Sequence, residues 1–430
     1  MLPGPNTAST RPRSRMDRRL LKAAGALAVL LVLFLLLHHG TTPSVPILPA
    51  GPGKASIEIR FGRHAALLLA PDGSIWGWGQ QDSLLGEVAD LAGWPQFRPL
   101  PLGSNWTAIA ASSRAGVGIR SDGTLCQWRF DSAGSAPATL VPFAQTNSAQ
   151  GWRSVAGGWD HLTALEKTGT LWSTGGNARG QLGDGTFFGN TNWVRVKFEG
   201  EWKSTTSLDA ASYGLDSSDT LWHWGFIENP GESQPGFDTR IPNRMEGGPW
   251  TRVVPGHLVS AIRDREGAWW VWGPAAENAL GSPHRHRPFR LPPCQDSVAV
   301  VIWASSVVRL DPAGGLWICG PDPGPAASST GPDADPKHWR PLHPERRWNQ
   351  LWSDAETMLA LDSDGVLWTW GRDLSPPTRA DRLLSNLSNW LRNHGSSVEF
   401  GQAGDRWISD PVPVARIPRP ETAEAQRRRE

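Results

Sequence analysis

The 430-residue sequence predicts an all-β fold: a seven-bladed β-propeller of about 48-residue repeats, preceded by one N-terminal transmembrane helix. Three observations support this prediction. Tryptophan occurs 25 times and tyrosine once, which indicates one short pattern copied many times. The pattern is a few apolar residues, a turn, and Leu-Trp-x-Trp-Gly, and its seven copies lie 46 to 51 residues apart. Residues 20–37 are almost entirely apolar.

Residues 1–37 have the features of a membrane-targeting segment. Residues 1–19 form a basic tail with five arginines and one aspartate, and residues 20–37 read LLKAAGALAVLLVLFLLL. At about 1.5 Å per residue, such a helix nearly crosses a hydrocarbon core of roughly 30 Å. Basic residues tend to stay cytoplasmic. We therefore predict a single-pass signal anchor with its N-terminus in the cytoplasm and the body in the bacterial periplasm or at the cell surface.

A cleaved secretory signal peptide is the alternative interpretation of residues 20–37. The apolar run is longer than in most signal peptides, and His38-His39-Gly40 is not a small-residue cleavage site. The anchor is therefore favoured, while cleavage stays open. Residues 38–54 are rich in proline and predict an extended linker. The charged residues 419–430 predict a disordered tail.

The body over residues 55–418 divides into seven units, each predicted to form a blade of about four short strands. Trp76 and Trp78 are two residues apart, so they project from one face of a strand, and Asp72-Gly73 before them predicts a hairpin turn. One such sheet cannot bury both of its faces, but sheets stacked in a ring can. The units are residues 55–103, 104–149, 150–199, 200–247, 248–293, 294–345 and 346–418.

Most of the tryptophans are predicted to pack between blades. Sixteen of the 25 occupy three positions that recur in register, two in the Trp-x-Trp tract and one at the start of an earlier strand, as at Trp106. A residue that recurs in register is typical of a shared core. We expect each indole to fill space left by glycine or another small residue on the next sheet. A carbohydrate-binding platform of tryptophans is the alternative.

One unit closely resembles a known repeat. Residues 157–165 read GGWDHLTAL, residues 168–172 read TGTLW, and residues 176–186 read GNARGQLGDGT. These motifs resemble the repeat of the regulator of chromosome condensation family, and the period and Trp-Gly strand extend the resemblance over residues 55–418. The resemblance implies a seven-bladed propeller closed by pairing strands from the two chain ends. Residues 56–61 would then lie beside residues 411–417.

The seventh unit departs from the pattern. Residues 378–395 predict an inserted helix, because three leucines, Trp390 and a fourth leucine fall on one helical face. A helix packed over the propeller rim and a helix that binds a partner are both open interpretations.

The sequence carries no recognisable catalytic or metal-binding motif. Three cysteines are too few for a disulfide scaffold or a four-cysteine zinc site, and two of them occupy tryptophan positions. His284 and His286 stand beside arginines without an adjacent carboxylate, which predicts a solvated loop. We predict no catalytic residue, no cofactor and no metal. Residues 41–430 carry 36 basic and 40 acidic groups, and this net charge of −4 argues against nucleic acid as a partner.

The connections between the strands supply candidate partner-binding residues. Exposed tryptophan together with arginine is typical of interaction hot spots. Tryptophans that cap blade edges are the alternative. The candidates are Trp159, Arg179, Gln181, Trp339, Arg372, Asp373, Trp390 and Trp407.

Together these features predict a non-enzymatic, membrane-anchored interaction module with a monomeric body that binds a protein partner through its loop face. The resemblance implies relatives that include a guanine nucleotide exchanger for a small GTPase and a secreted inhibitor of β-lactamase, both of which act by surface complementarity. A scaffold or inhibitor-like role suits the predicted topology. Nucleotide exchange is an alternative that requires a cytoplasmic body. Envelope glycan binding is an alternative that requires exposed, stacked tryptophans.

Overall fold

The computed structural model describes residues 45–49, 57–62, 65–79, 85, 94–129, 139–142, 151–226, 238–257, 259–273, 276, 280, 288–321, 338–374 and 407–417. The chain divides into two units, Met1–Val45 and Pro46–Glu430, and the second unit contains the sheets. The predicted anchor (20–37), inserted helix (378–395) and tail (419–430) lie outside the described residues. Within the described part of the chain, no helix is long and apolar enough to cross a membrane.

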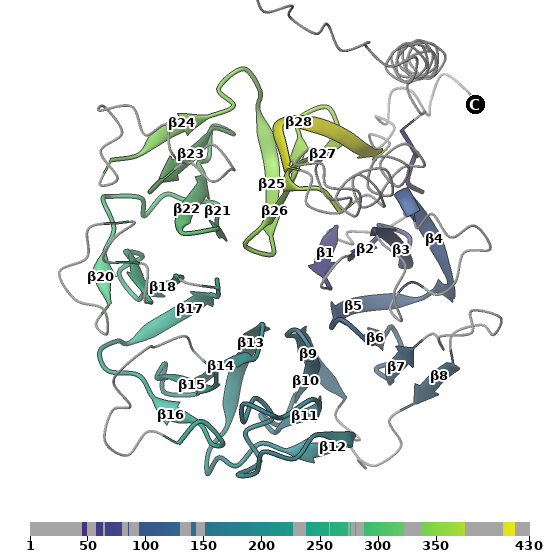
Figure 1. The fold of residues 1–430 in the computed structure, drawn as a ribbon, viewed down its shortest axis with the longest axis vertical. Coiled ribbons are helices and arrows are strands. Elements are labelled where there is room, and N and C mark those ends of the chain that lie inside the picture. Colours follow the sequence, from purple (N-terminus) through teal and green to yellow (C-terminus); the bar gives the residue numbers. More distant parts are fainter. Residues whose placement is uncertain are drawn as a thin grey trace, which may run out of the picture. The chain divides into compact units, whose positions relative to one another are not determined.

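The second unit folds into seven four-stranded antiparallel sheets arranged in a ring (Figure 1), so the predicted all-β, seven-bladed architecture is confirmed. Blades 1 and 2 contain β1 (Glu58–Phe61), β2 (Ala65–Leu69), β3 (Ser74–Gly79), β4 (Trp94–Ser104), β5 (Trp106–Ala111), β6 (Gly116–Arg120), β7 (Leu125–Arg129) and β8 (Thr139–Pro142). Blades 3 and 4 contain β9 (Trp152–Gly157), β10 (His161–Glu166), β11 (Leu171–Gly175), β12 (Asn190–Arg195), β13 (Trp202–Leu208), β14 (Ala211–Asp216), β15 (Leu221–Gly225) and β16 (Asn243–Arg244).

The remaining three blades follow the same order of strands. Blade 5 contains β17 (Trp250–Val254), β18 (Ser260–Asp264), β19 (Trp269–Trp272) and β20 (Phe289–Arg290). Blades 6 and 7 contain β21 (Ala299–Trp303), β22 (Ser306–Leu310), β23 (Leu316–Cys319), β24 (Arg340–Leu342), β25 (Trp348–Ser353), β26 (Thr357–Asp362), β27 (Val366–Arg372) and β28 (Trp407–Arg416).

The ring closes without the shared sheet that the family resemblance implies. Each sheet consists of four consecutive strands, with β1 in blade 1 and β28 in blade 7. The predicted pairing of residues 56–61 with residues 411–417 is therefore wrong. The physical reason is that each segment belongs to its own blade: β1 is the inner strand of blade 1, paired with β2, and β28 is the outer strand of blade 7, paired with β27.

The two chain ends instead meet through a short N-terminal arm, residues 46–48. Ile47 forms a parallel bridge with Arg416 of β28, and the Leu48 amide donates to the Arg416 carbonyl at 2.8 Å. Leu48 is only 1% exposed and belongs to a cluster that joins Ile59 of blade 1 to Leu359 of blade 7. This part of the predicted linker is therefore packed on the propeller and is not a free stalk.

The indoles pack between blades, as the repeat predicts. Seven buried hydrophobic clusters occur in the described residues, and each combines residues from two neighbouring blades. Trp202 and Trp224 of blade 4, for example, pack against Leu165 of blade 3. Some glycines that make room for them face the neighbouring blade, since a Cβ on Gly183 of blade 3 would lie 2.8 Å from Trp224 Nε1 of blade 4, but others lie in the same blade. A Cβ on Gly214 would lie 2.4 Å from the Trp202 ring, and Gly214 is on the adjacent strand of the same blade.

The first tryptophan of the Trp-x-Trp tract is half-buried, and a carboxylate fixes it. Trp222 Nε1 donates to Asp216 Oδ2 at 2.9 Å, while Asp216 Oδ1 accepts amide protons from the turn that precedes the strand. In blade 2, Cys126 replaces this tryptophan and Arg120 replaces the acid. The same Trp-to-carboxylate bond recurs at Trp172–Glu166, Trp270–Asp264, Trp317–Asp311 and Trp368–Asp362.

The alternating strand directions place two sets of loops on one side of the ring. The first strand of each blade lies nearest the centre of the ring (Figure 1), and the loops between strands one and two and between strands three and four emerge on the same side. We call this side the loop face.

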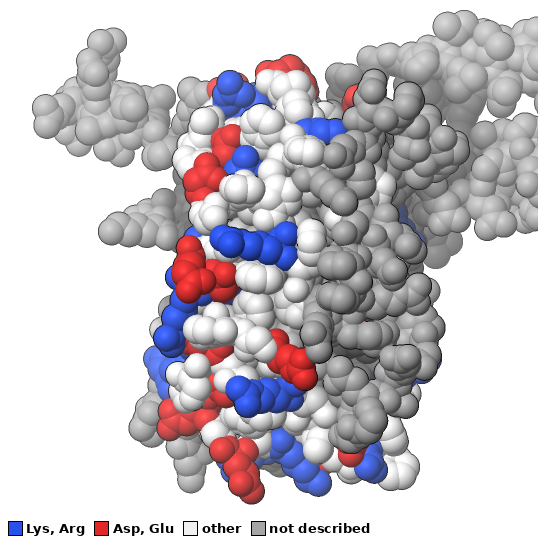
Figure 2. All heavy atoms as spheres, turned by 90° about the vertical axis from the view of Figure 1, so that its left-hand side faces the viewer, with Lys and Arg blue, Asp and Glu red and all other residues white. Residues whose placement is uncertain are grey.

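The outer side of the ring that carries β20 and β24 has acidic and basic side chains interspersed (Figure 2), so this described surface has no field of a single sign to steer a charged partner.

Candidate functional site

The loop face of blades 3 and 4 gathers exposed aromatic side chains. Among the described residues, the exposed aromatic side chains are Trp159 at 44%, Phe187 at 50%, Phe188 at 82% and Phe226 at 38%. All four lie on loops of the loop face, three in blade 3 and one in blade 4. We call these four residues the aromatic patch.

Two arginines stack on rings of the aromatic patch. Arg179 Cζ lies 4.4 Å from the Phe226 ring centroid, and Arg240 Cζ lies 5.5 Å from the Phe187 centroid. Arg240 is also paired with Asp238 at 2.9 Å. The Arg179 guanidinium has no carboxylate partner among the residues that the structure describes, so its charge is available at an exposed aromatic surface.

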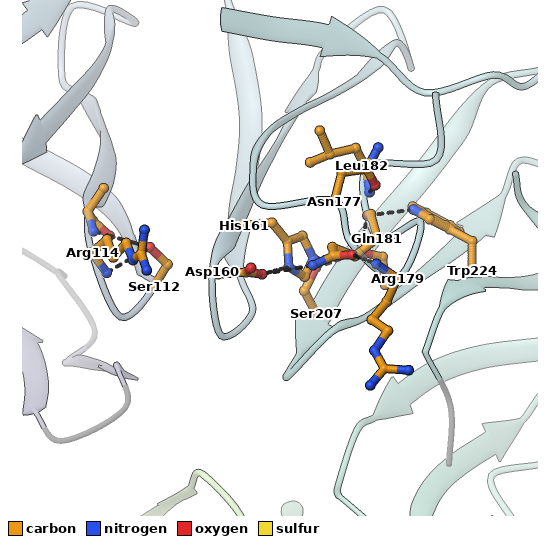
Figure 3. Close-up of polar contacts among 12 residues, drawn as sticks. Ser112, Arg114, Asp160, His161, Asn177, Arg179, Gln181, Leu182, Ser207 and Trp224 are labelled. Atoms are coloured by element: carbon orange, nitrogen blue, oxygen red, sulfur yellow. Dashed lines mark hydrogen bonds and ion pairs between the residues drawn. The ribbon is translucent and has the colours of Figure 1, made fainter. Parts of the chain in front are cut away.

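Gln181 holds the blade 3 loop in place from inside the protein. Its side-chain amide donates to Asp160 Oδ1 at 2.9 Å, and its Oε1 accepts from the Arg179 amide at 2.9 Å. The Gln181 carbonyl accepts from Ser212 Oγ at 3.1 Å and from Trp224 Nε1 at 3.0 Å, both in blade 4. Figure 3 shows the Arg179 side chain extending away from this network. The network thus fixes the loop while it leaves Arg179 exposed.

The same network sets the state of the buried His161. The Ser212 hydroxyl donates its only proton to the Gln181 carbonyl. The Ser212 oxygen must therefore accept the hydrogen bond from His161 Nε2, which lies 2.7 Å away. Nδ1 is therefore the acceptor nitrogen of a neutral ring. Burial lowers the pKa of His161 to about 4, which agrees with the neutral form. Nδ1 has no hydrogen-bond partner among the described residues and lies 4.0 Å from Asp160 Oδ1.

Ionisable groups from three blades converge at the loop-face end of the central channel. His257 of blade 5 pairs through Nδ1 with Asp209 of blade 4. Burial alone would lower the pKa of His257, but the Asp209 carboxylate outweighs burial and raises it. In blade 7, Arg372 pairs with Glu356, and burial raises the pKa of Asp354 to about 6. This cluster therefore contains two groups, His257 and Asp354, whose pKa values lie above their ordinary values.

Two cavities open beside these groups. The central channel has a volume of about 460 Å³ and is lined by the first strands of all seven blades, represented by Ile59, Ala111, Val155, Thr205, Val253, Val301 and Leu351. A second cavity of about 610 Å³ lies between the loops of blades 3, 4, 5 and 7, with Trp159, Asp160 and Phe226 in its lining. Two residues of the aromatic patch, Trp159 and Phe226, thus border a hollow.

The predicted site residues fall into three groups. Trp159 and Arg179 come together at the second cavity, and Arg372 lines the channel. Gln181 and Asp373 are 1% and 7% exposed, so they lie inside the protein.

The remaining predicted residues do not join this site. Trp339 is half-buried against the cluster between blades 5 and 6, and its Nε1 donates to the Pro292 carbonyl at 3.3 Å. Trp407 stacks on Trp303 with centroids 5.9 Å apart and rings 9° from parallel. Both pack at blade edges, as the alternative interpretation expects. Trp390 lies outside the described residues.

Sequence reasoning missed several residues of the site. Phe187 and Phe188 form the exposed end of the blade 3 loop, and two adjacent phenylalanines in a glycine-rich loop were an available signal. Phe226, Asp209 and His257 gave no local signal, because only the closing of the ring brings the loops of blades 3, 4 and 5 together. In the described ranges, no group of three His, Cys, Asp or Glu side chains could hold a metal ion.

Fold and site together define a seven-bladed propeller with a repeat of the regulator of chromosome condensation type. Residues 152–181 match the regulator of chromosome condensation (RCC1) repeat, so the resemblance predicted for this unit is confirmed. No curated protein matches the sequence.

Three solved structures share the fold at low sequence identity. Human WBSCR16 is 15% identical with a TM-score of 0.52, over 70% of this chain and 88% of that chain. Prp20p from Saccharomyces cerevisiae, described with its binding properties to Gsp1p and histones, is 12% identical with a TM-score of 0.59, over 82% and 87%. Yeast RCC1 (Prp20) bound to Kap60 is 13% identical with a TM-score of 0.59, over 91% and 96%. These identities establish similarity of fold alone.

Proposed function

We propose that this protein is a non-enzymatic, membrane-anchored interaction module, with a scaffold or inhibitor-like role, that binds a protein partner through the loop face of blades 3 and 4. The observation that supports this most is the aromatic patch beside Arg179. Aromatic residues and arginine are enriched at the energetic centres of protein interfaces. A soluble protein has little reason to expose four large rings on neighbouring loops unless they are covered by a partner.

The order of these loops adds to the argument. The blade 3 loop is held by Asn177, whose side-chain amide donates to Asp184 Oδ1 at 3.1 Å and to the Phe188 carbonyl at 3.2 Å. Its side-chain oxygen accepts from the Leu182 amide at 3.0 Å. A loop that is already ordered loses little conformational entropy on binding, which favours affinity.

Site-specific photo-crosslinking in the full chain tests the partner and the face together. A photoreactive phenylalanine replaces Phe188, which is 82% exposed, and in a control replaces Val412 on the rim strand β28, which is 45% exposed. We expect one protein to crosslink at position 188 and not at position 412. The combined variant Trp159→Ala and Phe187→Ala should lower the yield at 188 several-fold. Equal capture at both positions, or capture of lipid and glycan alone, contradicts the proposal.

The membrane anchor and the orientation in the proposal rest on residues 1–37. A reporter fused after residue 418 should be active outside the cytoplasm only, and the protein should stay with the membrane after alkaline extraction. A reporter active only in the cytoplasm would contradict the proposed topology. That result would favour nucleotide exchange on a small GTPase, the function of one relative that the resemblance implies.

A further inference from the structure

The cavity of about 610 Å³ beside Trp159 presents charge and aromatic surface together. Trp159 and Phe226 form exposed aromatic walls, and three carboxylates line the same cavity: Asp160, Asp209 and Glu356. Asp209 is paired with His257, and Glu356 is paired with Arg372. Asp160 stands apart, because the described residues provide it with an amide from Gln181 and a neutral His161 but with no cation.

Among the described residues, the surroundings of the Asp160 carboxylate provide one hydrogen-bond donor, the Gln181 side-chain amide, and no positive charge. Its side chain is 34% exposed at the cavity, and the Nδ1 lone pair of the fully buried His161 lies 4.0 Å from its Oδ1. That nitrogen has no partner among the described residues. The neutral His161 ring brings no charge to the carboxylate, so an incoming cation would meet an Asp160 charge that no described residue neutralises.

The aromatic lining of the cavity indicates which kind of cation fits. Arg179 and Phe226 both line this cavity, with 4.4 Å between the Arg179 Cζ and the Phe226 ring centroid. A guanidinium beside an aromatic ring is thus already part of the lining of this cavity. Trp159, next to Asp160 in sequence, provides the second exposed ring, and tryptophan is the best aromatic partner for a cation.

We propose that Trp159 and Asp160 receive an arginine or lysine side chain of the protein partner, with the cation on the Asp160 carboxylate and its stem against the indole. This rests on the proposed function and names the partner's chemistry: a basic side chain projecting from its surface. Arg179 and Phe226 line the same cavity. The interaction is a charge-assisted hydrogen bond in a partly enclosed space, which is stronger than its neutral counterpart.

Two probes that differ in one charge test this inference. N-acetyl-arginine amide and N-acetyl-citrulline amide have nearly the same shape, but the citrulline compound is uncharged. Each is titrated into the full chain labelled with fluorotryptophan, and the Trp159 resonance is assigned from a Trp159→Phe variant. We expect the arginine probe to bind about five- to tenfold more tightly than the citrulline probe.

Variants locate the effect and separate it from a folding defect. Asp160→Asn retains a side-chain oxygen that can accept the hydrogen bond from Gln181. In this variant the affinity for the arginine probe should fall to the affinity for the citrulline probe. Asp238→Asn, on the same face but next to Arg240, should leave the preference intact. Equal binding of the two probes by the unmodified chain overturns the inference without any variant. If a protein crosslinks at position 188 but the two probes bind equally, only this inference is wrong. If the arginine probe binds preferentially but no protein crosslinks at position 188, the proposed function is wrong instead.

Discussion

At the scale of single residues, the repeated Trp-to-carboxylate bond explains how a tryptophan-rich sheet keeps its edges ordered. In blade 5, Asp264 accepts from the Ala268 amide at 2.7 Å and from Trp270 Nε1 at 2.8 Å, so one carboxylate closes the turn and fixes the indole. The substitution in blade 2, where Cys126 and Arg120 replace both partners at once, fits this pairing. An acid six residues before a tryptophan thus recurs in five of the seven blades, whereas in blade 1 the Trp76 indole donates to Ser74.

Loss of one such carboxylate should destabilise the propeller measurably. Asp264→Ala removes the acceptor for two donors, and we expect the free energy of unfolding to fall by about 1–3 kcal/mol. Urea unfolding followed by circular dichroism measures this change. Glu266→Gln, an exposed position in the same turn, is the matched control and should be neutral. An unchanged free energy of unfolding in Asp264→Ala would contradict this prediction and would show that water replaces the carboxylate without loss of stability.

The titrating groups at the channel mouth predict a dependence of stability on pH. Burial raises the pKa of Asp354 to about 6, above the value of about 3.9 for an unfolded aspartate. The folded state therefore binds this proton more tightly, and the resulting stabilisation, complete below about pH 4, is lost as the pH rises to about 6. The raised pKa of His257 acts at higher pH, because its stabilisation is present below about pH 6.5 and is lost as the pH rises through the folded value.

Two variants separate these windows. Relative to the unmodified chain, Asp354→Asn should gain stability as the pH rises from about 4 to 6, because it no longer buries a charge there. His257→Gln should lose stability below about pH 6.5 and differ less above the folded pKa. The measurement is the free energy of unfolding in urea at a series of pH values. Parallel pH profiles for both variants and the unmodified chain would contradict the assignment.

At the scale of elements, the blade 3 loop is the part of the site that the sequence predicted best. Its match to a known repeat placed Trp159 and Arg179 on one unit, and the structure brings them to one cavity. Gln181 was predicted as a contact residue, but its amide is needed inside the loop, a role that residue type alone does not reveal. The strands were predictable because Trp-x-Trp has the two-residue period of a half-buried strand.

Gln181→Ala should loosen the loop without unfolding the ring. It removes the bonds to Asp160 and to the Arg179 amide, while the backbone carbonyl that serves blade 4 remains. We expect faster hydrogen exchange over residues 176–189, with little change in the global unfolding temperature. Exposed Asn192→Ala on the neighbouring strand β12 is the control. Unchanged exchange in this loop would assign its order to Asn177 instead.

At the scale of the whole molecule, the closure of the ring was the feature that sequence reasoning did not obtain. The repeat period and the strand pattern gave the correct number of seven blades, because each blade is formed by one continuous stretch of sequence. Closure depends on whether the first blade supplies its own outer strand. That strand, β4, does not contain the Trp-Gly motif of the repeat. The N-terminal arm was hidden in a proline-rich stretch, where Leu48 is the residue that becomes buried.

The adjacent residues Ile47 and Leu48 offer a direct test of the arm. Leu48→Ala removes a side chain that is 1% exposed from the cluster between blades 7 and 1, and we expect a loss of about 2–5 kcal/mol in the free energy of unfolding. Ile47→Ala changes a side chain that is 67% exposed and should be nearly neutral. Equal effects from both substitutions would mean that the arm does not hold the ring together in solution.

The arrangement of every blade from consecutive strands has a consequence for biogenesis. Each sheet can complete its hydrogen bonds as soon as its own stretch of chain has left the ribosome, without waiting for a distant segment. Assembly can then proceed in order along the chain, and each newly made blade docks on its predecessor. Only the interface between blades 7 and 1, which includes Leu48, requires a finished polypeptide, so a nascent chain released early would expose the apolar flank of blade 1.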